Sequence, residues 1–151
     1  MKRKDLTLLP PEELFSAVHQ LLQDGYDVKF TVTGNSMWPL LANRRDCVTL
    51  RKADAHLLKK GDIVLLQVHS GYRLHRITGL KNGLLQTTGD YNCYRDDYVD
   101  AKCVLGRVIN FTRKGKQVSC KKSLYRFSSW LWRVLFPIRP VLLRLLFLFR
   151  R

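Results

Sequence analysis

Residues 63–88 have the sequence IVLLQVHSGYRLHRITGLKNGLLQTT, in which three runs rich in β-branched and apolar residues are separated by short turn sequences. The runs cover residues 63–68, 72–78 and 84–88, and the turns are His69-Ser70-Gly71 and Lys81-Asn82-Gly83. Short connections that contain glycine are typical of β-hairpins. This stretch therefore predicts three consecutive antiparallel strands at the centre of a mainly β fold.

Similar runs on both sides extend this predicted sheet. They cover residues 28–33, 47–50 and 104–112, with a short one at residues 117–120. Helical and strand patterns do not alternate, which excludes a doubly wound parallel fold. One helix is expected before the first strand, beginning at Pro10-Pro11-Glu12-Glu13 and ending at Asp24-Gly25.

The charge divides the chain into a nearly neutral domain and a basic tail. Residues 1–100 contain 14 Lys and Arg and all 12 acidic residues, whereas residues 101–151 contain the other 13 basic residues. We therefore expect an N-terminal helical segment at 1–27, a β domain at 28–120 and an amphipathic helical tail at 121–151. The hydrophobic fraction of 46% is sufficient for a packed core and excludes general disorder.

The tail combines arginines with large apolar residues. Pro137 and Pro140 interrupt the apolar run, so two short helices joined by a kink are expected. Arg133, Arg139 and Arg144 lie inside the run, and an arginine at the centre of a bilayer costs about 2.5–3.5 kcal/mol or more. The pattern favours an anchor that lies in the plane of the membrane and is separable from the β domain, with the arginines at headgroup level.

Trp130 and Trp132 are expected at the interface between lipid and water. Membrane lipid is therefore the expected partner of the tail, and nucleic acid is not expected, because nucleic-acid tails rarely contain so many aliphatic residues. A tail that spans the bilayer, or that folds onto its own domain or a partner, stays open. The amino end has no pattern of an export segment, which favours the cytoplasmic face of a membrane.

Three kinds of polar residue predict catalytic chemistry. Ser36 follows the first strand at a Gly-Asn turn, His75 lies in a later strand, and the acids Asp90, Asp96 and Asp97 follow the third central strand. Serine, histidine and aspartate in these settings indicate a nucleophile, a base and an orienting acid. The four cysteines lack metal-ligand spacing, so neither a metal nor another cofactor is expected.

Each of these residues also has an ordinary interpretation. A serine after Gly-Asn is a common turn residue, and an aspartate after glycine is a common turn acid. His75 could be a strand histidine that faces solvent. Met37-Trp38 could pack against a neighbouring element or form an apolar floor beside the substrate. Co-occurrence, rather than any single residue, therefore supports catalysis.

Five short motifs in order resemble those of the type I signal peptidase family. They are Gly34-Asn35-Ser36-Met37-Trp38-Pro39, Lys60-Gly61-Asp62-Ile63-Val64, Leu74-His75-Arg76-Ile77, Thr88-Gly89-Asp90-Tyr91-Asn92 with Asp96-Asp97, and Val104-Leu105-Gly106-Arg107-Val108. Histidine at the base position resembles the Ser–His branch of the family. The resemblance implies a β-rich serine endopeptidase that removes signal or leader peptides by cutting after small residues.

The resemblance also implies individual roles. Ser36 matches the nucleophile, His75 the base, Asp97 the orienting acid and Asp90 a supporting carboxylate. The loop that contains Asp96 and Asp97, called the acid loop below, is one residue longer than is usual in the family. This length leaves open whether Asp96 or Asp97 orients His75.

The family often has a serine at the position of Gly34, so Asn35 or the backbone alone is expected to hold the oxyanion, and Met37 and Trp38 are expected substrate contacts. The alternative is a non-catalytic or self-processing relative that acts as a regulatory or binding module. Residues 1–27 contain only one expected helix, which disfavours a DNA-binding repressor.

Overall fold

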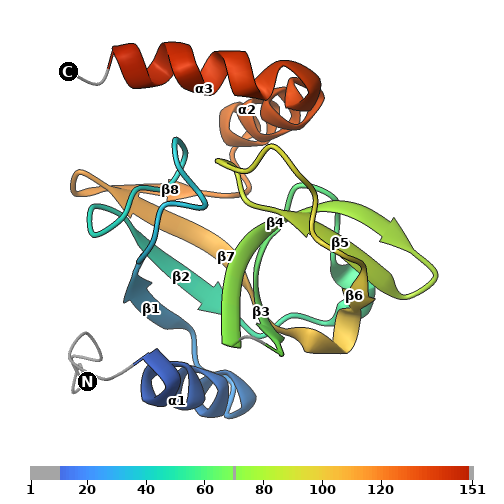
Figure 1. The fold of residues 1–151 in the computed structure, drawn as a ribbon. Helices are drawn as coiled ribbons and strands as arrows, with labels where there is room; N and C mark the ends of the chain where they lie inside the picture. The colour runs from blue at the N-terminus through green and yellow to red at the C-terminus, as the bar shows by residue number, and fades with distance from the viewer. Residues whose placement is uncertain (1–10, 70, 150–151) are drawn as a thin grey trace.

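The computed structural model describes residues 11–69 and 71–149, and these residues form one antiparallel eight-stranded sheet with three α-helices (Figure 1). The prediction of a mainly β fold with helices at both ends is confirmed. Three parts of the chain lie outside the described residues: residues 1–10, which include the predicted helix start at Pro10, the turn residue Ser70, and residues 150–151. The strands are β1 (Val28–Thr31), β2 (Cys47–Arg51), β3 (Ile63–Val68), β4 (Gly71–Lys81), β5 (Leu84–Thr88), β6 (Val99–Asp100), β7 (Val104–Arg113) and β8 (Lys116–Ser119).

The β3–β4–β5 meander forms as predicted from residues 63–88. Val68 pairs with Gly71 across the first turn, and Lys81 pairs with Leu84 across the second. Asn82 and Gly83 have φ values of 50° and 77°, the left-handed conformation that a tight hairpin requires at both central positions. β4 is longer than predicted because β5 pairs with it up to this second turn.

β7 joins the two halves of the sheet, because it pairs with β2 on one side and with β3 on the other. The order along the sheet is β1-β2-β7-β3-β4-β5-β6, and β8 pairs with the end of β7. The sequence did not predict β6, whose two residues are too few for a period-2 pattern.

Helix α1 (Pro11–Gln23) covers one end of the sheet, as Figure 1 shows, and buries Val18 and Leu22 completely. Gly106 of β7 permits this approach, because a Cβ atom there would lie 3.0 Å from the Leu22 side chain. Each large apolar side chain buried in this way stabilises the fold by about 1.5–3 kcal/mol. Apolar residues of α1, β1, β2, β3 and β7 therefore form the main core.

The C-terminal helices lie on the opposite side of the sheet from α1 in Figure 1. They are α2 (Ser123–Val134) and α3 (Arg139–Leu148), joined by a short 3₁₀ turn at Phe136–Ile138. The predicted pair of short helices with a break near the prolines is therefore confirmed. None of the described helices has the length and apolar character needed to cross a bilayer.

The tail packs against the β domain, which is the alternative to a free membrane anchor that the sequence left open. Tyr125 and Ser129 of α2 and Arg139 and Leu143 of α3 are buried. Arg139, expected at the level of lipid headgroups, is only 1% exposed. Its guanidinium donates hydrogen bonds to backbone carbonyls, which is why it lies inside the protein.

Candidate active site

Ser36 lies in a closed loop between β1 and β2. The backbone N–H of Val32 donates to the carbonyl of Asp46 at 2.9 Å, and the N–H of Arg44 donates to the carbonyl of Val32 at 2.8 Å. The Asp46 carboxylate is fully buried and accepts from the N–H of Ala42 at 2.9 Å. These bonds close the loop at its base and leave Ser36 half-buried near its tip.

The acid at the base of this loop stays ionised. Burial alone would raise the pKa of Asp46, but hydrogen bonds from Arg45 and Ala42 and the charges of Arg45 and Arg113 lower this pKa below its usual value. The Arg45 guanidinium donates two bonds to the carboxylate, at 2.7 and 2.9 Å. The charged form of Asp46 therefore secures the loop that contains Ser36.

The residues beside Ser36 have different environments. The Asn35 carbonyl accepts from the N–H of Trp38 at 3.0 Å, which makes a tight turn around the serine. Met37, a predicted substrate contact, is only 2% exposed and packs in the main core, so its side chain secures the loop instead. Trp38 is half-buried, and its ring meets that of Tyr91 edge-on at 5.9 Å.

The Ser36 loop is attached to the segment that follows β5. The Ser36 carbonyl accepts from the N–H of Tyr91 at 2.9 Å. At Gly89, a Cβ atom would lie 2.6 Å from the same carbonyl oxygen, closer than such atoms can approach. Thr88, the preceding residue, pairs with Arg76 of β4, the neighbour of His75. The Gly-Asp motif therefore brings the serine loop to the strand pair that contains the histidine.

His75 and Asp96 form a buried pair. Nδ1 of His75 lies 2.6 Å from Oδ2 of Asp96, and each side chain is 7% exposed. Since an ionised carboxylate can only accept, Nδ1 is the nitrogen that has the hydrogen. A neutral His75 therefore has its free lone pair at Nε2, which is the arrangement of a general base with its orienting acid.

Asp96 is secured by β5 as well as by His75. Its backbone N–H donates to the Thr87 carbonyl at 2.9 Å, and the Thr87 hydroxyl donates to its carboxylate at 2.6 Å. Burial alone would raise the pKa of Asp96, but the hydrogen bonds from His75 and Thr87, together with the charges of His75 and Arg73, lower this pKa below its usual value. The carboxylate is therefore ionised at neutral pH.

Asp97, predicted as the orienting acid, is exposed to solvent. The residue that contacts His75 is Asp96, one position earlier. The reason is the attachment of Asp96 to β5 through Thr87, which aligns the acid loop on this strand. The length of the acid loop had left these two residues as alternatives, and the backbone pairing with β5 distinguishes them.

Asp90, predicted as a supporting carboxylate, pairs with Arg76 rather than with His75. Two hydrogen bonds of 2.8 and 2.7 Å join the two side chains, and each residue is 1% exposed. Burial alone would lower the pKa of Arg76, but the Asp90 carboxylate and the Tyr125 hydroxyl raise it above its usual value. The same guanidinium donates to the Ser129 hydroxyl at 2.7 Å. The Asp90–Arg76 pair thus connects the loop after β5 to helix α2.

The C-terminal helices also hold this loop through its backbone. The Trp132 indole donates to the Asp90 carbonyl at 3.1 Å. Arg139 donates to the carbonyls of Gly89 at 3.3 Å and Asn92 at 3.0 Å. Sequence analysis did not assign these roles to Arg76 and Arg139. The available signal was an arginine within an apolar run, which requires a buried acceptor if it faces the interior.

The described residues contain no hydrogen bond between the Ser36 hydroxyl and His75. In enzymes without substrate, such catalytic bonds are often long and shorten when substrate binds. The structure thus joins His75 to Asp96 directly and brings the serine loop to the adjacent segment through Gly89 and Tyr91. Within the same described residues, no group of three His, Cys, Asp or Glu side chains could hold a metal ion.

Comparison of the chain with models of known protein families finds no match, and comparison with curated proteins finds none either.

Proposed function

We propose that the protein is a serine endopeptidase of the type I signal peptidase kind, with the fold of that family and His75 as general base. The observation that supports this most strongly is the buried contact of 2.6 Å between His75 Nδ1 and Asp96 Oδ2. It leaves Nε2 available to accept a proton. The next residue, Arg76, pairs with Thr88, and the segment after Thr88 contacts the Ser36 loop. The substrate class, a signal or leader peptide with small residues before the cut, comes from the resemblance of the sequence motifs.

The proposed reaction has two steps. Ser36 Oγ attacks the peptide carbonyl carbon while His75 Nε2 accepts the hydroxyl proton, and this proton then passes to the leaving amine. Water hydrolyses the resulting ester with His75 again as the base. Asp96 stabilises the imidazolium that forms in each step, and the Ser36 N–H is the expected donor to the oxyanion.

Ser36→Ala tests this function. The substitution removes the nucleophile and little buried volume, so it should abolish cleavage of peptides with alanine at the first and third positions before the cut. Thr33→Ala, an exposed hydroxyl in the same loop, is the matched control and should cut at the rate of the unchanged protein. A fluorophosphonate probe should attach to Ser36, and mass spectrometry should detect no adduct in the alanine variant.

The missing hydrogen bond between Ser36 and His75 favours a second candidate, a non-catalytic or regulatory relative. The probe distinguishes the two candidates without a known substrate. An unmodified Ser36 after prolonged incubation, in a folded protein, would contradict the proposed catalysis and support the second candidate.

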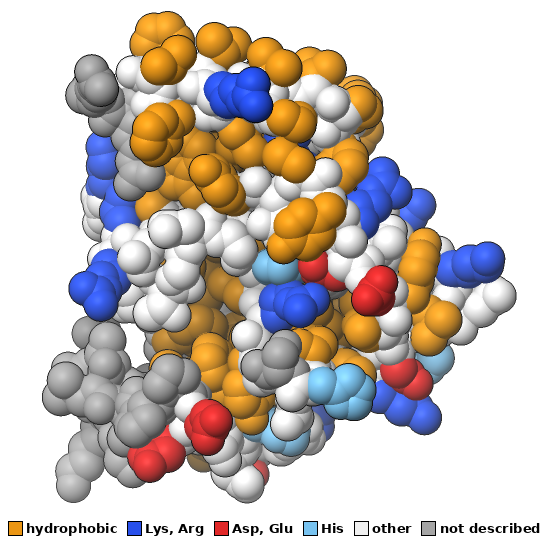
Figure 2. All heavy atoms as spheres, in the orientation of Figure 1, with side chains coloured by type: hydrophobic (Ala, Val, Ile, Leu, Met, Phe, Trp, Pro, Cys, Tyr) orange, Lys and Arg blue, Asp and Glu red, His pale blue; other side chains and the backbone are white. Residues whose placement is uncertain are grey.

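We also propose that the C-terminal helices bind the protein to an anionic membrane surface. Figure 2 shows hydrophobic side chains gathered over these helices at the top of the molecule. The exposed apolar residues are Leu124, Phe127, Trp130, Leu131, Val134, Ile138, Val141, Leu145, Leu146, Phe147, Leu148 and Phe149. No acidic residue occurs after Asp100, so the charged residues of the two helices are all basic, which suits acidic lipids.

A further inference from the structure

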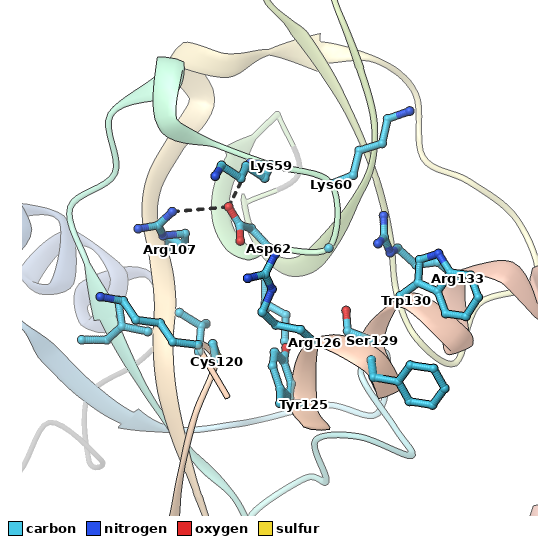
Figure 3. Close-up of a pocket in the computed structure, with 16 residues that line it drawn as sticks. Lys59, Lys60, Asp62, Arg107, Cys120, Tyr125, Arg126, Ser129, Trp130 and Arg133 are labelled. Atoms are coloured by element: carbon cyan, nitrogen blue, oxygen red, sulfur yellow. Dashed lines mark hydrogen bonds and ion pairs between the residues drawn. The ribbon is translucent and has the colours of Figure 1, made fainter. Parts of the chain in front are cut away.

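A cavity of about 640 Å³ lies between helix α2 and the sheet, away from the His75–Asp96 pair. Its walls come from the segment before β3, from β7 and from α2, as Figure 3 shows. The proposed peptidase reaction does not use this space. Its lining nevertheless has a specific chemical character, which identifies the kind of ligand that fits.

The cavity is strongly basic. Its charged lining residues are one acid, Asp62, and the six bases Lys59, Lys60, Arg107, Lys121, Arg126 and Arg133. The Asp62 carboxylate is already engaged, because it accepts from the backbone N–H of Lys59 at 2.9 Å and lies 3.5 Å from the Arg107 guanidinium. The described residues therefore leave most of the positive charge without a counter-charge.

Arg133 has an unsatisfied donor at the wall of this cavity. Its Nε is buried and has no hydrogen-bond partner among the residues that the structure describes. The guanidinium lies over Gly61, where a Cβ atom would be 3.4 Å from the central carbon of the group. Burial and the nearby charge of Arg76 lower the pKa of Arg133 below its usual value. A bound anion would reduce the repulsion between these cations.

We propose that this cavity binds a phosphate group. Three of the six bases are arginines, whose planar donors match the oxygens of phosphate in paired hydrogen bonds. A multiply charged anion also neutralises several bases at once, which a single carboxylate does not. The group could belong to a lipid headgroup or to a free phosphate compound.

The rim favours the lipid headgroup. Phe127 and Trp130 line the cavity, are 58% and 49% exposed, and continue into the exposed apolar face of α2. A phosphate in the cavity would therefore have apolar surface beside it for an acyl chain. Ser36 does not line this cavity, so the proposal of phosphate binding can be tested independently of the proposed catalysis.

The first arm of the test uses inorganic pyrophosphate and the full chain in calorimetry. In the double variant Lys121→Gln/Arg126→Gln, both changed residues are exposed lining residues, so the fold should remain intact. Its dissociation constant should rise at least tenfold. The matched control Lys29→Gln/Arg44→Gln removes the same charge from exposed positions outside the cavity and should change the constant less than twofold.

The second arm measures binding to vesicles of phosphatidylcholine with about 20% phosphatidic acid, at constant salt. Loss of vesicle binding in the cavity variant but not in the control identifies a lipid headgroup as the source. If the cavity variant loses affinity for pyrophosphate but still binds vesicles as the control does, the source is a free phosphate compound. Equal behaviour of the cavity variant and the control in both arms would overturn the proposal, because general surface charge would then explain all binding.

Discussion

Asp96 has contacts that serve two purposes at once. Its carboxylate accepts from His75 and from the Thr87 hydroxyl, while its backbone N–H and carbonyl bond to Thr87 and Gln86 of β5. The backbone bonds fix the position of the acid, and the side-chain bonds fix the orientation of the imidazole. A residue secured in this way can select one histidine tautomer without an adjustment when substrate binds.

Asp96→Asn should therefore lower kcat/KM by a factor on the order of 10²–10⁴, because an amide in place of the carboxylate permits the wrong histidine tautomer. Asp97→Asn is the matched control: it makes the same chemical change one residue later, at an exposed position, and should leave kcat/KM within about twofold. Steady-state kinetics on one peptide measures both. If instead Asp97→Asn lowers kcat/KM and Asp96→Asn does not, Asp97 is the orienting acid.

Activity and stability should both depend on pH, for different reasons. Protonated His75 cannot accept a proton, so kcat/KM should fall as the solution becomes more acidic. Asp96 has a lowered pKa in the folded protein, so its contribution to stability is complete above its unfolded pKa and is lost only as the pH falls below that pKa and through the lower folded one. Urea unfolding followed alongside kinetics separates the two effects. A kcat/KM that stays constant from neutral to acidic pH, in a protein that stays folded, would exclude His75 as the base.

At the scale of secondary-structure elements, the important relation is between α3 and the loop after β5. Arg139 begins α3, yet its guanidinium bonds to carbonyls of Gly89, Asn92 and Trp132. The Gly89 side of the loop in turn contacts the backbone of Ser36. The position of the serine loop therefore depends on helices that follow the β domain in the sequence.

Arg139→Gln should lower the free energy of unfolding by about 2 kcal/mol or more, because it removes charged hydrogen bonds from a buried site. Arg144→Gln makes the same change on the exposed side of α3 and should cost less than about 0.5 kcal/mol. Urea denaturation of both variants measures the difference. Equal stability of the two variants would mean that the loop does not need the Arg139 contacts.

The strands could be predicted because their signals are local. The run from residue 63 to 88 has its own turn chemistry, and Asn82-Gly83 adopts the backbone that this pair favours. The pairing of Arg76 with Asp90 is different, since it depends on a loop and on helix α2 arriving at the same place. The charge pattern of the tail therefore suggested a separate anchor, whereas burial of Arg139 follows from acceptors that only the folded loop provides.

At the scale of the whole molecule, the C-terminal helices present an exposed apolar face, and their segment of the sequence has only basic charges (Figure 2). Several exposed apolar side chains gain on transfer to the lipid interface, and each nearby arginine adds about 1 kcal/mol at an acidic surface. These features support the proposal that the C-terminal helices bind a membrane surface.

Leu124→Ser/Phe147→Ser should weaken binding to anionic vesicles at least tenfold, because both side chains are exposed on the C-terminal helices and their loss leaves the core unchanged. Leu57→Ser/Leu84→Ser removes exposed leucines elsewhere and is the matched control. Vesicle sedimentation at low and high salt measures both contributions, since salt weakens only the electrostatic one. Equal vesicle binding by the two variants would contradict a membrane role for the helices.

The buried contacts of Arg139 and Trp132 also determine when the protein becomes complete during synthesis. The ribosome makes the Ser36 loop, β4 and the acid loop before the two helices that secure residues 89–92. Until α2 has emerged, the Arg76–Asp90 ion pair lacks the Tyr125 and Ser129 side chains that cover it. A nascent chain that stops before α2 would therefore have every proposed catalytic residue and still lack a settled active site, which would delay any peptidase activity until synthesis has passed the last of these helices.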